Sequence, residues 1–130
     1  MNKAEKVVVD SDILIDHLRG LPQARNFLKQ IEDEKLVGYV SVITEAELAS
    51  GKRAAITDER KRIQALLGIF RRVIINSEIA WTAGEFRRKY ECRLMDAFIA
   101  ATAYHEKAKL MTRNLRHFEK IREITVEVPY

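Results

Sequence analysis

The chain has 130 residues, of which 47% are hydrophobic and 32% are charged, so it is long enough for one folded domain and too apolar for a disordered chain. Its formal net charge of +4 is a mild basic bias, which permits a nucleic-acid partner without demanding one. No apolar run approaches the roughly 20 residues of a membrane span, and the short apolar segment near the start is too brief for a signal peptide. The single cysteine, Cys92, cannot form an internal disulfide, which fits a cytoplasmic protein.

Short β-branched or aromatic runs alternate with amphipathic segments along the whole chain. Strands are predicted over 6–10, 38–42, 73–75, 109–112 and 124–128. Helices are predicted over 13–19, 23–34, 44–50, 57–70, 78–90, 95–107 and 115–121. This alternation predicts a parallel sheet with helices on both faces, and the lack of repeats or linkers predicts one domain over residues 1–130.

The first predicted strand carries three consecutive valines and runs into Asp10, Ser11 and Asp12. An uninterrupted apolar run this short is typical of a strand that is buried on both faces. The acids stand at its carboxyl end, where ligands bind in open α/β sheets. Asp10 is therefore a candidate first ligand of a divalent metal, whereas the alternative is that Ser11 or Asp12 merely caps the next helix.

Polar residues also follow other predicted strands. They are Glu47 in the helix after the second strand, Asp96 at the start of the alanine-rich helix, and Asn114 after the fourth strand. The carboxyl ends of parallel strands lie along one edge, so these side chains can converge with Asp10. Each also has a local alternative: Thr44 and Glu47 have capping-box spacing, Asp96 suits the positive end of a helix, and Asn114 suits a helix cap.

A convergent set of carboxylates suits Mg²⁺, which takes oxygen ligands, keeps several waters and leaves room for a substrate phosphate. Zinc is disfavoured because Cys92 is alone and the three histidines show no paired ligand spacing. Two basic segments, 52–72 and 113–122, would suit a phosphate polymer if the acids hold a metal, although any single basic cluster is more simply a solvated helix face.

Four segments, 8–16, 41–51, 95–103 and 111–118, resemble the PIN-domain ribonucleases, most closely the VapC-type toxins of prokaryotic toxin–antitoxin pairs. They occur in the family's order and span nearly the whole chain. The resemblance implies a PIN-like three-layer α/β/α fold with a central, mainly parallel five-stranded sheet. It also implies an endoribonuclease that depends on Mg²⁺ or Mn²⁺, with RNA and a cognate antitoxin as partners, and a homodimer.

The resemblance assigns roles to individual residues. It implies that Asp10, Glu47 and Asp96 hold the metal and that Asn114 positions water or metal for in-line attack on the phosphate. The second acid of the family lies four residues before a glycine, which selects Glu47 over Glu45. Candidate neighbours of the ligands are Ser11, Asp12 and Thr112. Ser11 stands where the family usually has Thr, and Asp12 stands where it often has Asn, so the role of Asp12 is open.

Two other functions fit parts of the same pattern. An acid, a spacer and an acid after a strand resemble the nucleophile motif of haloacid dehalogenase-type phosphatases, but Ile13 and Leu14 replace the small residues and threonine of that motif. A catalytically inactive PIN-like module that binds RNA or protein is the second alternative, against which the three acids argue.

Overall fold

The structure is a computed structural model that describes residues 3–130. The expected single domain over 1–130 stays a prediction, and its first two residues lie outside the described part. Among residues 3–130, no helix is both long and apolar enough to cross a membrane.

The described chain alternates strands and helices, as expected. The strands are β1 (Glu5–Val9), β2 (Leu36–Ser41), β3 (Arg71–Val73), β4 (Lys109–Met111) and β5 (Val126–Glu127). The helices are α1 (Ser11–Leu18), α2 (Pro22–Glu32), α3 (Val42–Ala49), α4 (Thr57–Leu67), α5 (Ser77–Tyr90), α6 (Leu94–Glu106) and α7 (Leu115–Phe118), with a short 3-10 helix, η1 (Lys52–Ala55).

All five strands pair in parallel, in the order β3-β2-β1-β4-β5. β1 is therefore the central strand, and its valines are fully buried. Val7 and Val9 pack into the core on one face of the sheet, and Val8 packs into the core on the other face. Burial on both faces explains why this strand is an unbroken Val run rather than an alternating pattern.

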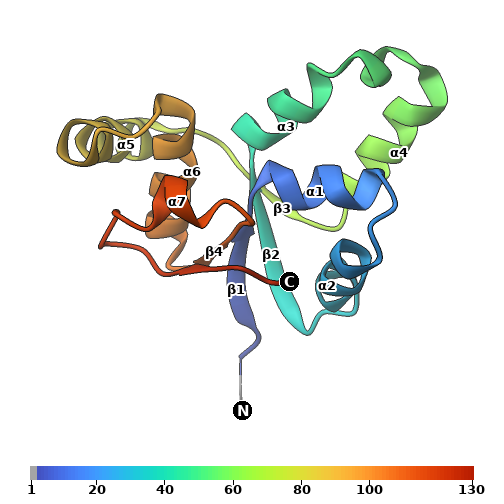
Figure 1. Cartoon of the computed structure of the whole chain (residues 1–130), viewed down its shortest axis with the longest axis horizontal. Helices are drawn as coiled ribbons and strands as arrows, with labels where there is room; N and C mark the ends of the chain where they lie inside the picture. Colours follow the sequence, from blue (N-terminus) through green and yellow to red (C-terminus); the bar gives the residue numbers. More distant parts are fainter. Residues whose placement is uncertain (1–2) are drawn as a thin grey trace.

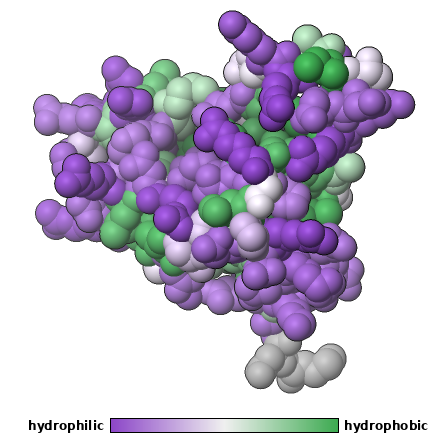
Figure 2. Space-filling model, turned by 45° about the vertical axis from the view of Figure 1, so that its right-hand side comes forward, coloured by the Kyte–Doolittle hydropathy of each residue, from purple (hydrophilic) through white to green (hydrophobic). Residues whose placement is uncertain are grey.

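Each face of the sheet is covered by its own group of helices, which gives the expected three-layer α/β/α fold (Figure 1). α1, α2 and α4 contribute Leu14, Phe27 and Leu67 to one core. α5 and α6 contribute Phe86 and the buried face of an alanine-rich helix to the other. On the face drawn in Figure 2, hydrophobic residues form small areas between hydrophilic ones.

Several helix and strand boundaries differ from the sequence prediction. α3 begins at Val42 rather than at 44, because the Ser41 hydroxyl accepts the backbone N–H of Ile43 at 3.1 Å and caps the helix. The capping box of Thr44 and Glu47 is therefore wrong: Thr44 lies inside the first turn, and its buried hydroxyl has no partner within the described residues. α7 and β5 are shorter than predicted, and η1 was not predicted.

Candidate active site

Asp10 lies at the junction of β1 and α1. Its Oδ1 atom accepts the backbone N–H of Ser11 at 2.8 Å, so Asp10 itself is the N-cap of α1. The expectation that Ser11 or Asp12 caps this helix is wrong, because α1 begins two residues earlier than predicted. The backbone N–H of Asp10 also donates to the carbonyl of Met111 at 3.0 Å, which ties the end of β1 to the end of β4.

Thr112, directly after β4, holds both aspartates. Its fully buried hydroxyl lies 2.9 Å from Oδ2 of Asp10 and 3.3 Å from Oδ2 of Asp12. A hydroxyl has one proton, so it donates to one of the two carboxylates at a time. Its oxygen also accepts the backbone N–H of Asn114 at 3.0 Å, and the backbone N–H of Arg113 donates to Asp12 at 2.8 Å. Asp10 and Asp12, at the start of α1, are thereby oriented by the residues that follow β4.

The two glutamates of α3 point to different partners. The Ser11 hydroxyl donates to Oε2 of Glu47 at 3.2 Å, which places Glu47 beside the end of β1. Glu45 instead forms an ion pair with Arg72 of β3, with Nε and Oε1 3.4 Å apart. Glu47 is thus the glutamate on the side of the aspartates.

Asp96, in the first turn of α6, is paired with His117 of α7. Nδ1 of His117 lies 3.2 Å from Oδ2 of Asp96. The side-chain amide of Asn114 lies 3.0 Å from the same nitrogen, and a Nδ1 that donates to Asp96 cannot also accept from that amide. Asn114 occupies the N-cap position of α7, as expected, but its side chain makes no capping hydrogen bond. His117 is a neighbour of the site that the sequence did not indicate.

The carboxylates at this edge bind their protons more tightly than free carboxylates do. Burial, followed by the charge of Asp12, raises the pKa of Asp10 to about 6. Burial also raises the pKa of Asp12, Glu47 and Asp96. The charges of Asp96 and Asp12 raise the pKa of Glu47 further, whereas His117 acts to lower that of Asp96. The negative charges of these acids therefore repel one another. A cation bound among them would reduce this repulsion and offset the cost of burying the charged carboxylates.

The donor set fits a hard divalent cation that keeps several waters, since it consists of carboxylate oxygens with one amide nearby. The side chains are not preassembled around an ion: in the described chain, no three His, Cys, Asp or Glu side chains form a group that could hold a metal. Asp96 is turned toward His117, and Asp12 is turned toward the Arg113 backbone. The ligand roles of Asp10, Glu47 and Asp96 remain predictions.

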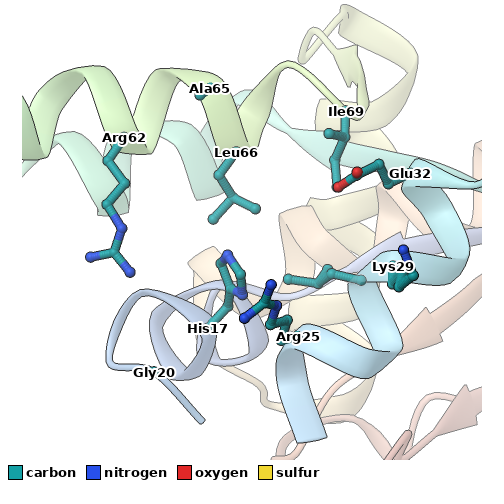
Figure 3. Close-up of a pocket in the computed structure, with 10 residues that line it drawn as sticks. His17, Gly20, Arg25, Lys29, Glu32, Arg62, Ala65, Leu66 and Ile69 are labelled. Carbon is teal, nitrogen blue, oxygen red and sulfur yellow. The ribbon is translucent and has the colours of Figure 1, made fainter. Parts of the chain in front are cut away.

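A separate cavity of about 490 Å³ lies between α1, α2 and α4 and contains none of these acids. Figure 3 shows His17, Arg25 and Arg62 gathered at one end of it, with Glu32 and Ile69 toward the other. Burial, then the charges of Arg62 and Arg25, lower the pKa of His17. This cavity is a feature of the helical layer. It does not belong to the acidic edge of the sheet, by which we mean Asp10, Asp12, Glu47 and Asp96.

Replacing Thr112 by Val is expected to lower the free energy of unfolding by about 1–3 kcal/mol, because it leaves the buried Asp10 carboxylate and the Asn114 N–H without their partner. Thr102→Val is the matched control: Thr102 is equally buried, but its hydroxyl donates only to the Phe98 carbonyl one turn earlier in α6, at 2.8 Å. Urea denaturation measures both. Equal losses in the two variants would show that Thr112 has no special role.

Comparison with known proteins points to one family. The family model described as "PIN domain" matches residues 7–124. A Mycobacterium tuberculosis protein named ribonuclease VapC10 is 37% identical over 123 residues, which cover 91% of this chain and 90% of that protein. A toxin–antitoxin complex from Klebsiella pneumoniae contains a chain with 31% identity and a TM-score of 0.81, covering 95% of this chain and 98% of that one. The DNA-bound VapBC from Salmonella typhimurium, at 22% identity, 97% and 99% coverage and a TM-score of 0.84, shows the same fold.

Proposed function

Since this chain belongs to the PIN-domain family and, within it, to the VapC ribonucleases, we propose that it is a metal-dependent endoribonuclease and the toxin of a toxin–antitoxin pair. Its reaction is the hydrolysis of RNA phosphodiester bonds. The haloacid dehalogenase alternative is wrong, because the whole matched range, 7–124, belongs to a different family.

The observation that carries this proposal is the acidic edge of the sheet. Asp10 directly follows β1, Glu47 lies in α3, and Asp96 lies in the first turn of α6. The pKa of each of these three carboxyls is raised. A fold gains no stability from crowding buried carboxylates, so their grouping suits a function that needs them.

The chain's own residues hold the acids for this work. Ser11 and Thr112 fix the orientation of Asp10, the Ser11 hydroxyl holds Glu47, and His117 holds Asp96. Mg²⁺ or Mn²⁺ held by Asp10, Glu47 and Asp96 supplies activation of water and stabilisation of charge on the phosphate. We propose that the Asn114 amide orients a water or the phosphate, and the bond from its backbone N–H to the Thr112 hydroxyl supports this role.

The direct test is incubation of the purified chain with total cellular RNA and Mg²⁺ or Mn²⁺, followed by mapping of the cut ends. We expect discrete cleavage sites that disappear when EDTA removes the metal. RNA that stays intact with either metal would favour the alternative of a binding module without catalysis.

A cognate antitoxin is part of the proposal, and it is supported by the Klebsiella pneumoniae neighbour, which is described as a toxin–antitoxin complex. A small gene next to the one that encodes this chain, whose product binds it and inhibits RNA cleavage, would establish the pairing. The cytoplasmic location stays a prediction.

We also propose that two copies of the chain associate through the amino end of α5. Within the described residues, Trp81 and Ile74 are the most exposed large hydrophobic side chains, with 80% and 73% of their surface accessible. Tryptophan is enriched at protein–protein interfaces, so the exposed Trp81 is a candidate anchor for a second copy of the chain. Trp81→Glu is therefore expected to convert a dimer into a monomer in analytical ultracentrifugation, whereas Ile56→Glu, at an exposed residue before α4, leaves it dimeric. A Trp81→Glu variant that sediments as a dimer would place the interface elsewhere.

A further inference from the structure

A groove on the Glu47 side of the acidic edge has the chemistry of a nucleotide subsite. It is a cavity of about 260 Å³ between α1, α3, η1 and α4, and Glu47 forms part of its wall. We call it the Glu47 groove. Its apolar floor is formed by Ile15, Leu18, Leu48 and Ile63. The groove therefore adjoins Glu47, one of the three acids proposed to hold the metal.

The rim of the Glu47 groove is basic. Arg19, which follows α1, and Lys52 and Arg53 of η1 line it and are exposed. Within residues 3–130, none of these three cations takes part in an ion pair. Glu59, which also lines the groove, is paired with Arg62 instead. The rim therefore offers uncompensated positive charge next to an apolar floor.

We propose that the Glu47 groove binds one unpaired base of the RNA strand beside the cut phosphate, while Arg19, Lys52 and Arg53 contact the neighbouring phosphates. This inference rests on the proposed ribonuclease function. It requires the base at this position of the strand to be unpaired, because a paired base cannot enter an apolar groove. It also makes the groove a determinant of the cleavage sequence.

The size and the position of the groove support this occupant. Pockets for drug-sized ligands span about 300–1,000 Å³, so a smaller cavity suits a single base better than a folded protein segment. Asp10 is the N-cap and Arg19 the C-cap of α1, so they lie about 13.5 Å apart along the helix axis. A strand that advances about 3.4 Å or more per nucleotide spans this distance within about four nucleotides.

A second cavity, which Asp96 borders, can bind the RNA strand on the other side of the cut phosphate. This cavity of about 190 Å³ is lined by Asp96 and His117 together with Arg93, Arg116 and Lys120. Glu47 therefore borders one cavity that basic residues line, and Asp96 borders another. This arrangement matches a polyanion that passes over the acids and is held on both sides.

The first test measures binding without cleavage. In the background of Asp10→Asn, we compare the double variant Lys52→Ala, Arg53→Ala with the control Arg60→Ala, Lys61→Ala, which removes the same charge from exposed positions of α4 outside the groove. Fluorescence anisotropy with a labelled single-stranded RNA oligomer is expected to show affinity about tenfold weaker for the first variant and less than twofold weaker for the control. The dependence of log affinity on log salt concentration should also become shallower by about 1.4 for the first variant. Equal losses in both variants, or equal binding of a duplex, would overturn the subsite.

The second test examines whether the apolar floor of the Glu47 groove contacts a base. Ile63→Ala enlarges the Glu47 groove, and Ile69→Ala is the matched control, because Ile69 is similarly half-buried near the end of α4 but faces the separate cavity of Figure 3. Ile63→Ala is expected to change the base preferred at one fixed position relative to the cut and to lower kcat/KM on the preferred sequence by about fivefold, while Ile69→Ala leaves the cut pattern unchanged.

The outcomes separate this inference from the proposed function. Metal-dependent cleavage with the same pattern in wild type and Ile63→Ala would refute the subsite and keep the ribonuclease. An absence of cleavage in wild type would refute the ribonuclease, and the anisotropy comparison would still decide whether the groove binds single-stranded RNA. Loss of antitoxin binding, with RNA binding unchanged, in the Lys52→Ala, Arg53→Ala variant would show that the groove serves a protein partner and overturn the proposal.

Discussion

Asp10→Asn is expected to lower the rate of RNA cleavage about a thousandfold, which corresponds to about 4 kcal/mol of transition-state stabilisation. The amide keeps the size of the carboxylate but removes the negative charge that a divalent cation needs. The fold should persist, since asparagine caps helices as well as aspartate and can still accept the Ser11 N–H.

Cleavage of a defined RNA at fixed Mg²⁺ or Mn²⁺ concentration measures this loss, and circular dichroism checks the fold. Asp58→Asn, at an exposed acid in the first turn of α4, is the control and is expected to keep full activity. Full activity in a folded Asp10→Asn protein would contradict the assignment of Asp10 as a metal ligand.

The same substitution is expected to stabilise the protein at neutral pH by up to about 3 kcal/mol. Burial first, and the charge of Asp12 second, raise the pKa of Asp10 from its ordinary value of 3.8 to about 6 in the folded protein. The folded state therefore holds this proton more tightly than the unfolded chain does. Its stability declines as the pH rises from about 3.8 to about 6, and the loss is complete above that range.

The difference in the free energy of unfolding between Asp10→Asn and wild type isolates this effect from the other acids. Measured in urea without divalent metal, the difference should be small below pH 4, grow between about pH 4 and 6, and then stay constant. A difference that does not change with pH would show that the Asp10 carboxyl titrates normally. Active-site groups often lower the stability of an enzyme, so the removal of one of them is expected to stabilise the fold.

The sequence was most informative where local pattern and tertiary environment agree. A run of three valines predicts a strand that is buried on both faces, and β1 lies at the centre of the sheet with Val7 and Val8 in opposite cores. Parallel topology then places the residues that follow β1 and β4 at one edge, which is why Asp10 and Thr112 come within hydrogen-bonding distance across 102 positions.

Local capping signals were less informative because several residues compete for one cap. Ser41 and Thr44 both carry hydroxyls suited to an N-cap, and the end of β2 at Ser41 decides in favour of the first. Similarly, Asp10 takes the cap of α1 that Ser11 or Asp12 was expected to supply. Neither choice can be predicted from spacing alone.

Contacts between distant elements left no signal in the sequence. His117 reaches Asp96 only because α7 packs beside α6, and nothing in the spacing of the two residues indicates it. The choice of Glu47 over Glu45 came from family resemblance, and the structure adds a physical difference: Arg72 of β3 pairs with Glu45, and Ser11 bonds Glu47.

If Asp10, Glu47 and Asp96 bind one cation together, the two glutamates of α3 should differ in their effect on metal affinity. Mn²⁺ is titrated by calorimetry into wild type, Glu47→Gln and Glu45→Gln, two variants that lose the same charge two residues apart. We expect the affinity for Mn²⁺ to be at least about tenfold weaker for Glu47→Gln and unchanged for Glu45→Gln. Equal affinity in both variants and wild type, or a loss only in Glu45→Gln, would contradict this joint binding.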